Sequence, residues 1–338
     1  MKLLNTKATL LLTITTTLGV NTSSAWQLPS SAPRASSSSL RMMAEGGGKA
    51  KVTVLGGTGF VGSRVCKLLQ EEGADVTSVS KSGTIPSWCA GEAWTDGVSW
   101  KSADLLGGDE SSLVSAIGTP ESIVSCVGVV GFDREELLKG NGNANVAGFN
   151  AAAKSGGLKR SVFVSVSSEV AACEEKWLPE FFGGYFEGKR MAEKAALEAV
   201  EGNADSVCIV KPTFIYGGGS FGLFPPRVNA AYGSAVEELL SNKLIRVLAD
   251  VTPGLIKVAL RPPSAVEAVA GACAKAALGE KVKGTLDGTD DINEAAGQPD
   301  PTGLTEAIEW TGEKAKDVYG WLKVEVPKLI DSVKEKSA

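Results

Sequence analysis

The heptapeptide GGTGFVG, residues 56–62, indicates the fold of this 338-residue chain. It places Gly56, Gly59 and Gly62 at three-residue intervals, after the β-branched run VTVL and before apolar positions that recur at helical spacing. The first glycine permits a tight turn, the second lets backbone amides approach a pyrophosphate, and the third lets helix and strand pack closely. A helix N-terminus at this point attracts phosphate. The stretch therefore predicts a strand, turn and helix that bind a dinucleotide.

The segments that follow alternate between strand-like and helical patterns. Strands are expected at 52–55, 74–80, 98–101, 122–127, 161–166 and 206–211, and helices around 113–117, 143–153 and 185–200. Strands joined by crossover helices form a parallel sheet. The sequence therefore predicts an α/β fold, a doubly wound, mostly parallel sheet of the Rossmann type with helices on both faces.

The regular alternation ends near Phe214. Residues 214–263 are expected to form a small C-terminal substrate-binding region, with a helix at AAYGSAVEELL and a strand at LIRVLAD, and a core helix is expected at 265–278. The dinucleotide-binding domain with this region is placed at 50–290. Residues 291–338 are expected to contain a polar linker, part of DGTDDINEAAGQPDPTG, and an amphipathic helical tail. That tail would either dock on the body or contact a membrane or protein partner.

The composition excludes several kinds of catalytic site. The chain has no histidine, which removes the commonest zinc ligand and every catalytic scheme that uses an imidazole base. Its six cysteines are scattered singly, without a C-x-x-C pair, and most lie in apolar runs. They are typical of reduced, buried thiols, so we expect no metal site and no disulfide framework.

The N-terminus resembles a targeting sequence. The first acidic residue is Glu45, and Lys2 and Lys7 precede the apolar run ATLLLTITTTLGV. Residues 1–25 are typical of a signal peptide, and the Ser-rich residues 26–44 are typical of a transit peptide or linker. Together they resemble the bipartite plastid address of algae with secondary plastids. The alternatives are a secreted protein, which the unpaired cysteines disfavour, and a mitochondrial presequence.

The charge balance disfavours nucleic acid as a partner. The whole chain carries a net charge of -5, and removal of residues 1–41 leaves 30 basic and 39 acidic residues. A net charge of -9 without a basic stripe provides no electrostatic footprint for nucleic acid. Small-molecule substrates remain the expected partners.

The end of the second predicted strand favours NADP(H) over NAD(H). NAD sites usually carry an Asp or Glu about 20 residues after the glycines. This chain has Ser80, Lys81 and Ser82 there, so a cation and two hydroxyls are available for a 2′-phosphate. The alternative is a solvated surface lysine, and NAD(H) stays possible. The residues expected to contact the dinucleotide are Gly56, Thr58, Gly59, Phe60, Val61, Gly62, Ser80, Lys81, Ser82, Asp104, Leu105, Cys126, Val127, Gly128, Lys189, Pro212 and Thr213.

A series of motifs carries a resemblance to a known family. GGTGFVG, Asp104-Leu105, SCVG, NGNAN, VSVSS, YFEGK and KPTFIYG resemble the extended or atypical branch of the short-chain dehydrogenases/reductases. GYFEGKRMAE with VKPTFIYG is similar to a subgroup that includes plastoglobule proteins, related to the NADPH-binding accessory subunit of respiratory complex I and to a yeast coenzyme Q biosynthesis factor. The resemblance spans roughly residues 50–285.

The resemblance implies a catalytic set. Tyr185 matches the family's acid/base and Lys189 its partner, which on one helix face would lower the pKa of the phenol and bind the nicotinamide ribose. Ser167 would polarise the substrate oxygen, with Ser165 and Ser168 as alternates, and Asn141 would order a relay water. The implied reaction is hydride transfer to or from a small, apolar carbonyl or alcohol metabolite.

Two other functional classes remain open. The related complex I subunit implies a non-catalytic NADPH-binding structural or assembly factor, although such a scaffold has no need of Ser167, Tyr185 and Lys189 together. Some plastid proteins of this fold bind transcripts, which the acidic charge disfavours.

Overall fold

The computed structural model describes residues 49–219, 222–223 and 226–298. The targeting segments expected at 1–25 and 26–44 and the helical tail beyond 303 lie outside this range. Within it, no helix combines the length and apolarity needed to cross a membrane, and all six cysteines are free thiols.

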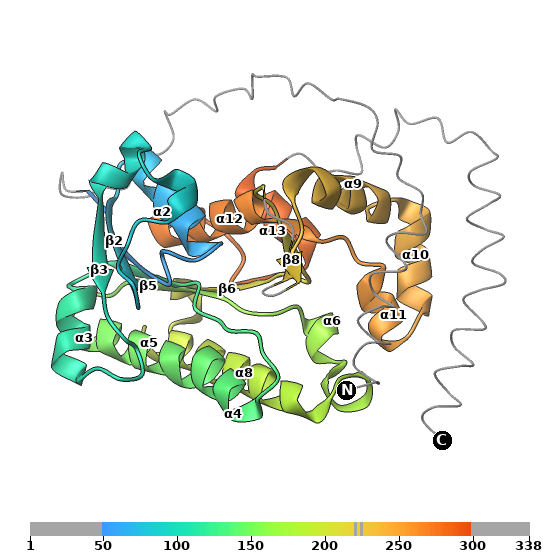
Figure 1. Ribbon diagram of the computed structural model, residues 1–338, viewed down its shortest axis with the longest axis horizontal. Coiled ribbons are helices and arrows are strands. Elements are labelled where there is room, and N and C mark those ends of the chain that lie inside the picture. The colour runs from blue at the N-terminus through green and yellow to red at the C-terminus, as the bar shows by residue number, and fades with distance from the viewer. Residues whose placement is uncertain (1–48, 220–221, 224–225, 299–338) are drawn as a thin grey trace.

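A seven-stranded sheet forms the centre of the molecule (Figure 1). Its order is β11-β6-β5-β4-β1-β2-β3, and every adjacent pair is parallel. The strands are β1 (Lys51–Leu55), β2 (Asp75–Ser80), β3 (Val98–Ser102), β4 (Ser122–Ser125), β5 (Arg160–Val164), β6 (Val207–Lys211) and β11 (Thr285–Asp287). The predicted parallel α/β fold is confirmed, and its strand order reverses beside β1, where such sheets bind ligands.

Helices cover both faces of the sheet (Figure 1). On one face lie α2 (Gly62–Glu71), α12 (Val266–Leu278) and α13 (Thr289–Ala296). On the other lie α3 (Glu110–Ile117), α4 (Arg134–Leu138), η4 (Lys139–Asn143), α5 (Ala144–Lys154) and α8 (Gly183–Glu198). Shorter helices are η2 (Ser87–Cys89), η3 (Ala93–Gly97), α6 (Ser168–Ala171), α7 (Glu174–Trp177), η5 (Glu180–Phe182) and η6 (Ala204–Ser206). The sheet is thus the middle of three layers.

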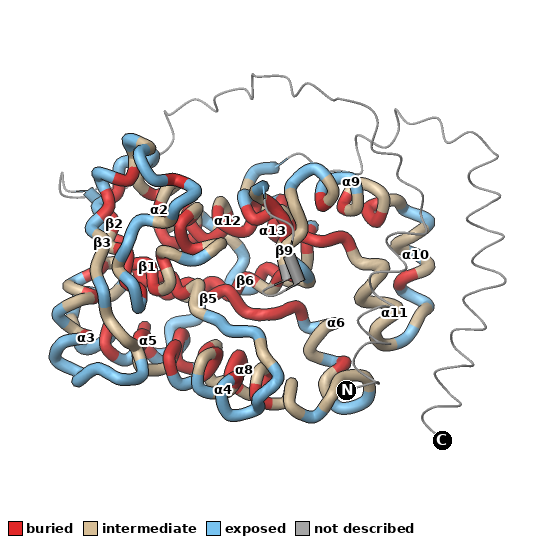
Figure 2. The backbone as a smooth tube through the Cα atoms, viewed as in Figure 1, coloured by how far each residue is buried: buried red, intermediate tan, exposed pale blue. Residues whose placement is uncertain are grey.

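Alternating strand residues form a core on each side of the sheet (Figure 2). Val52 and Val54 of β1 contribute to the side of α2 and α12, whereas Leu55 contributes to the side of α5 and α8. Two buried serines at the starts of strands bond helix carbonyls: Ser122 Oγ donates to Ala277 O at 2.6 Å, and Ser161 Oγ to Ala196 O at 2.5 Å.

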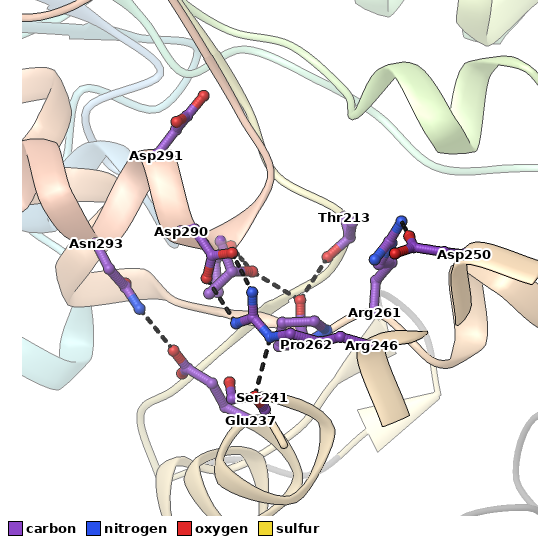
Figure 3. Close-up of polar contacts among 12 residues, drawn as sticks. Thr213, Glu237, Ser241, Arg246, Asp250, Arg261, Pro262, Asp290, Asp291 and Asn293 are labelled. Carbon is purple, nitrogen blue, oxygen red and sulfur yellow. Dashed lines mark hydrogen bonds and ion pairs between the residues drawn. The ribbon is translucent and has the colours of Figure 1, made fainter. Parts of the chain in front are cut away.

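A smaller region follows β6, as predicted for residues 214–263. It contains β7 (Ile215–Tyr216) paired with β10 (Ser264–Ala265), the antiparallel pair β8 (Gly222–Leu223) and β9 (Pro226–Arg227), and the helices α9 (Ala230–Leu240), α10 (Lys243–Val251) and α11 (Gly254–Ala259). Buried polar groups join it to α13: Glu237 accepts bonds from Tyr216 Oη at 2.6 Å and from Asn293 Nδ2 at 2.8 Å (Figure 3).

The strand expected at LIRVLAD is wrong, because α10 is a helix. Asn242 begins it by accepting the Leu244 N–H at 2.9 Å. The apolar residues of this segment recur at three- and four-residue steps, which suits a helix better than the two-residue step of a strand. Leu244, Val247 and Val251 lie on its exposed side.

The polar linker also begins later than expected. Residues 285–287 form β11, which pairs with β6, and Thr289–Ala296 form α13. Ile292 is fully buried, and Asp290 makes an ion pair with Arg246 of α10. Acidic residues in the first turn of α13 favour the positive end of the helix dipole, so a stretch with linker composition is a docked helix.

Candidate functional site

The turn after β1 has the geometry required to bind phosphate. Gly56 has φ 73°, and its N–H donates to Val79 O at 2.8 Å. A Cβ at Gly62 would lie 2.3 Å from Gly56 O, so the helix can start this close to the strand only with glycine there. In the part of the chain that the structure describes, the amides of Thr58, Phe60 and Val61 have no hydrogen-bond acceptor. Free N–H groups beside the N-terminus of α2 fit a pyrophosphate.

The loop after β2 carries a cation, Lys81, which lies beside Asp104 at the end of the neighbouring strand β3. The Lys81 side chain is 83% exposed, and its Nζ lies 3.1 Å from Asp104 Oδ2. The Asp104 carboxylate also accepts the Leu106 N–H at 3.1 Å, and these two contacts lower its pKa. Ser80 Oγ accepts the Gly83 N–H at 3.1 Å, and Ser82 Oγ contacts Thr84. Lys81 and Asp104 are therefore brought together, whereas both serines serve the local turn.

Two glycines let α8 approach the helical turn before α5. A Cβ at Gly188 would lie 2.7 Å from Gly142 N, and one at Gly184 would lie 2.0 Å from Arg134 O. Side chains at either position would push the helices apart. The stretch GYFEGKR therefore has a packing role: Gly184 and Gly188 set how closely the helix that carries Tyr185 and Lys189 approaches α4 and η4.

Lys189 is buried against the end of β5. Its Nζ donates to Val164 O at 2.9 Å and lies 4.8 Å from the ring centroid of Phe163 and 5.7 Å from that of Tyr185. Burial lowers the pKa of this amine to about 8. A Cβ at Gly128 would lie 3.5 Å from the same Nζ, so Lys189 lies close to the segment after β4.

Tyr185 is partly exposed and lies beside Lys189 on α8. Its ring packs edge-on against Phe186 at 5.1 Å. Burial raises the pKa of the phenol to about 12. The structure does not give the expected lowering of the phenol pKa by Lys189, because the amine lies over the tyrosine ring and donates to a backbone carbonyl. At neutral pH the phenol is therefore protonated.

Asn141 lies where the segment after β4 meets η4. It is fully buried; its Oδ1 accepts the Val129 N–H at 3.2 Å and its Nδ2 donates to Val129 O at 3.0 Å. A Cβ at Gly128 would lie 3.1 Å from its Oδ1. Asn141, Gly128 and Lys189 thus converge, and η4 is a π-helical turn, a distortion frequent at functional sites.

Sequence reasoning missed Asn145, which bonds the same segment. Its Oδ1 accepts from Ser125 Oγ, while its Nδ2 donates to Asn141 O at 2.8 Å and to Val127 O at 3.3 Å. Asn145 lies four residues after Asn141 within NGNAN, so one helix face carries both amides. That spacing was the available signal.

The segment after β4 connects the phosphate turn to this amide and lysine cluster. A Cβ at Gly56 would lie 3.2 Å from Val127 Cγ2 and 3.3 Å from the carbonyl carbon of Cys126. Burial raises the pKa of the Cys126 thiol to about 12, so this cysteine stays protonated. The phosphate turn therefore packs against the segment after β4, whose Gly128 lies beside Asn141 and Lys189.

The predicted serines differ in placement. Ser167 is buried; its N–H donates to Pro212 O at 3.0 Å and its Oγ accepts the Glu169 N–H at 3.2 Å. Ser165 Oγ instead donates to Glu193 at 2.5 Å. Ser168 is exposed, and its N–H donates to Asp287. Ser167 therefore lies beside Pro212, and Ser165 is engaged with α8.

Thr213 lies at the junction with the smaller region. Its Oγ1 donates to Pro262 O at 3.0 Å, the carbonyl that also accepts from Thr289 at 2.7 Å (Figure 3). Thr213, one of the residues expected to contact the dinucleotide, therefore also joins β6 to the smaller region through this bond.

Comparisons with known proteins agree with this geometry. The family model described as the NAD dependent epimerase/dehydratase family matches residues 52–253. An uncharacterized chloroplastic protein of Arabidopsis thaliana is 39% identical over 172 residues, which cover 49% of this chain and 51% of that protein. The chain thus matches about half the length of this curated relative.

Solved structures with a similar fold are more distant. Vestitone reductase from alfalfa (Medicago sativa) is 22% identical, with 70% of this chain and 75% of that one covered and a TM-score of 0.45. The Bordetella bronchiseptica enzyme WbmF in complex with NADH is 16% identical, with 74% and 78% covered and a TM-score of 0.47. At such identities the likeness concerns the fold alone.

The lowered pKa of Lys189 predicts a pH-dependent stability. An unfolded lysine keeps its proton to about pH 10.4, whereas folded Lys189 loses it near pH 8, so between these values the unfolded chain binds more protons. The free energy of unfolding should therefore rise with pH in this window, by at most about 1.4 kcal/mol per pH unit. In urea unfolding, the wild type should gain stability over Lys189→Met between about pH 7.5 and pH 9.5.

Lys194→Met is the matched control, since Lys194 lies on the same helix with its side chain 76% exposed. The difference in free energy of unfolding between Lys194→Met and the wild type should not change with pH. A Lys189→Met curve parallel to that of the wild type would contradict the burial of the charge.

Proposed function

Because this chain belongs to the NAD-dependent epimerase/dehydratase family, we propose that it is an NADP(H)-dependent oxidoreductase of the short-chain dehydrogenase/reductase type. Its substrate would be a small, apolar carbonyl or alcohol metabolite, with Tyr185 as the acid/base. The observation that supports this most is that the segment after β4 lies against the phosphate turn at one end and beside Asn141 and Lys189 at Gly128. Dinucleotide phosphates at one end would leave a nicotinamide near the tyrosine at the other.

A bound nicotinamide dinucleotide would supply or accept a hydride at C4. The chain's own residues would hold and protonate the substrate. The turn amides bind the phosphates, and Lys189, fixed by Val164 O, orients groups near the tyrosine. A phenol that is protonated at neutral pH can donate its proton to a carbonyl oxygen as that oxygen gains charge.

The preference for NADP(H) is supported by the loop after β2. An acidic side chain that would repel a 2′-phosphate is absent between Ser80 and Gly83. Lys81 is largely exposed and bonds only Asp104 in the described structure, so a phosphate can recruit it.

A plastid location is supported by the bipartite N-terminal pattern and by similarity to a chloroplastic Arabidopsis protein. A mitochondrial location is the alternative. The amphipathic pattern of the tail beyond residue 303 would let it dock on the body or contact a membrane surface, a plastoglobule or a protein complex.

A second candidate function is a cofactor-bound structural or assembly factor without turnover. The raised pKa of Tyr185 favours it, because a phenol that keeps its proton to about pH 12 is a poor base for the oxidative direction. The two candidates differ in whether hydride transfer occurs.

Tyr185→Phe separates these candidates. The ring would keep its packing against Phe186 while the acidic hydroxyl is lost. We expect NADPH binding, followed by nucleotide fluorescence, to stay within about twofold. Oxidation of NADPH with a panel of quinones, aldehydes and isoprenoid ketones should fall by about 100-fold or more.

Tyr319→Phe is the control, because it makes the same change in the tail outside the described residues, and its turnover should persist. NADPH binding without turnover by the wild type across the panel would contradict the enzyme and support the structural factor.

Lys81→Glu tests the cofactor preference. A carboxylate at this position repels a 2′-phosphate but accepts a 2′-hydroxyl, so the affinity ratio of NADPH to NADH should fall by about tenfold or more. The matched control is Lys154→Glu, an exposed lysine on α5 with the same charge change. An unchanged ratio in Lys81→Glu, measured by fluorescence titration with both nucleotides, would show that this loop does not contact the 2′ position.

A further inference from the structure

Two arginines contact the aromatic ring of the phosphate turn. The guanidinium carbon of Arg64 lies 4.7 Å from the ring centroid of Phe60, and that of Arg227 lies 4.2 Å from it. Arg64 belongs to α2 and Arg227 to β9, so residues more than 160 positions apart meet at this ring. The smaller region therefore reaches the nucleotide-binding turn through an arginine.

Arg64 is held firmly by its neighbours. Its Nη1 donates to Phe60 O at 2.8 Å, its Nε lies 3.3 Å from Glu267, and its guanidinium lies 4.5 Å from the Trp88 ring. Only 12% of its side chain is exposed. A Cβ at Gly218 would lie 3.1 Å from its Nη2, so the segment after β7 also passes against it. These contacts fix the position of the first cation.

Among the described residues, the Arg227 guanidinium lacks the carboxylate and carbonyl partners that Arg64 has. Among the residues that the structure describes, no carboxylate pairs with its guanidinium, although the residue is partly buried. Its burial and the charge of Arg64 both lower its pKa. Glu267 pairs with Arg64, and the nearby Arg227 has no carboxylate of its own among the described residues. A partly desolvated guanidinium without an anionic partner is unfavourable, and an anion would relieve that cost.

The ring between the arginines belongs to the residue whose amide is unpaired. Phe60 N–H has no acceptor in the described structure, and the amide of Val61 beside it is also free. A ligand oxyanion near Phe60 would meet both N–H groups and a guanidinium fork, the combination that binds phosphate well. The site therefore combines main-chain donors from one region with a side-chain donor from the other.

We propose that Arg227, positioned over Phe60, binds a phosphate-type oxyanion at the phosphate turn and so connects the smaller region to the bound ligand. The oxyanion would come either from the dinucleotide's pyrophosphate or from a phosphate on the second substrate. If the dinucleotide supplies the oxyanion, the proposal rests on the proposed function. If the second substrate supplies it, that substrate belongs to an anionic, phosphate-bearing class.

The test compares the full chain with Arg227→Gln and Arg227→Lys, and uses Arg134→Gln as the control. Arg134 is exposed and paired with Glu187, which makes it a matched loss of one surface charge. Two ligands are titrated: NADPH by fluorescence, and inorganic pyrophosphate by calorimetry, the latter into free protein and into protein saturated with NADPH. Circular dichroism confirms that each variant is folded.

The two sources give different results. If the dinucleotide supplies the oxyanion, Arg227→Gln weakens NADPH binding by about tenfold or more, and saturation with NADPH abolishes pyrophosphate binding. If the second substrate supplies it, NADPH binding is unchanged, and Arg227→Gln removes the pyrophosphate binding that persists in NADPH-saturated wild type. Arg227→Lys should recover part of the loss in either case, since it keeps the charge without the fork.

The proposal is overturned if Arg227→Gln leaves both NADPH and pyrophosphate affinities within twofold of wild type, or if the wild type binds neither ligand. Failure of the proposed function is a separate result. There, NADPH binds without turnover, or fails to bind, while pyrophosphate binding to the free protein still depends on Arg227.

Discussion

The close contact between Gly142 and Gly188 is the constraint on which the candidate site depends. It lets α8 approach η4 to a distance that a single methyl group would prevent. That approach places Lys189 where its amine can reach the Val164 carbonyl at 2.9 Å and lie next to Gly128 and Asn141. The same contact determines how closely the helix that carries Tyr185 lies to η4. Backbone packing, more than the charge of the pair, therefore establishes the geometry in which chemistry could occur.

The burial of Lys189 carries an energetic cost that its neighbours only partly offset. One carbonyl bond and two aromatic rings surround an amine whose pKa falls to about 8. The phenol next to it has a pKa near 12, so both groups favour their neutral forms more than free side chains do. At neutral pH the tyrosine therefore keeps its proton.

The fold and much of the site could be predicted from sequence because both depend on local patterns. GGTGFVG and the alternating apolar runs specify strand, turn and helix through backbone sterics and periodicity, and the structure confirms the sheet they predict. Tyr185 and Lys189 share a helix, so their spacing places them together. The strand LIRVLAD failed because its apolar residues fit a helix that the structure stabilises with Asn242 and Arg246.

The missed features depend on contacts between distant segments. α13 contains acidic residues typical of linkers, and its packing on α12 and its ion pair with Arg246 of α10 hold it as a docked helix. Asn145 gains meaning from the strand end that it bonds, and Arg227 from a ring more than 160 residues away. The Val127 carbonyl and the Phe60 ring lie too far along the chain to produce a spacing signal, and only the step from Asn141 to Asn145 did so. Long-range pairing of this kind requires the folded chain.

The central claim is that Lys189 and Tyr185 face the bound dinucleotide, and NMR of the lysine ε-methylene groups tests it most directly. Spectra of protein labelled at lysine Cε, with the Lys189 signal assigned from Lys189→Met, would be recorded with and without NADP⁺. The account predicts a free-state titration midpoint near pH 8 and a clear change in this signal on saturation. A Lys189 signal that titrates near pH 10.5 and does not change while NADP⁺ binds would contradict it.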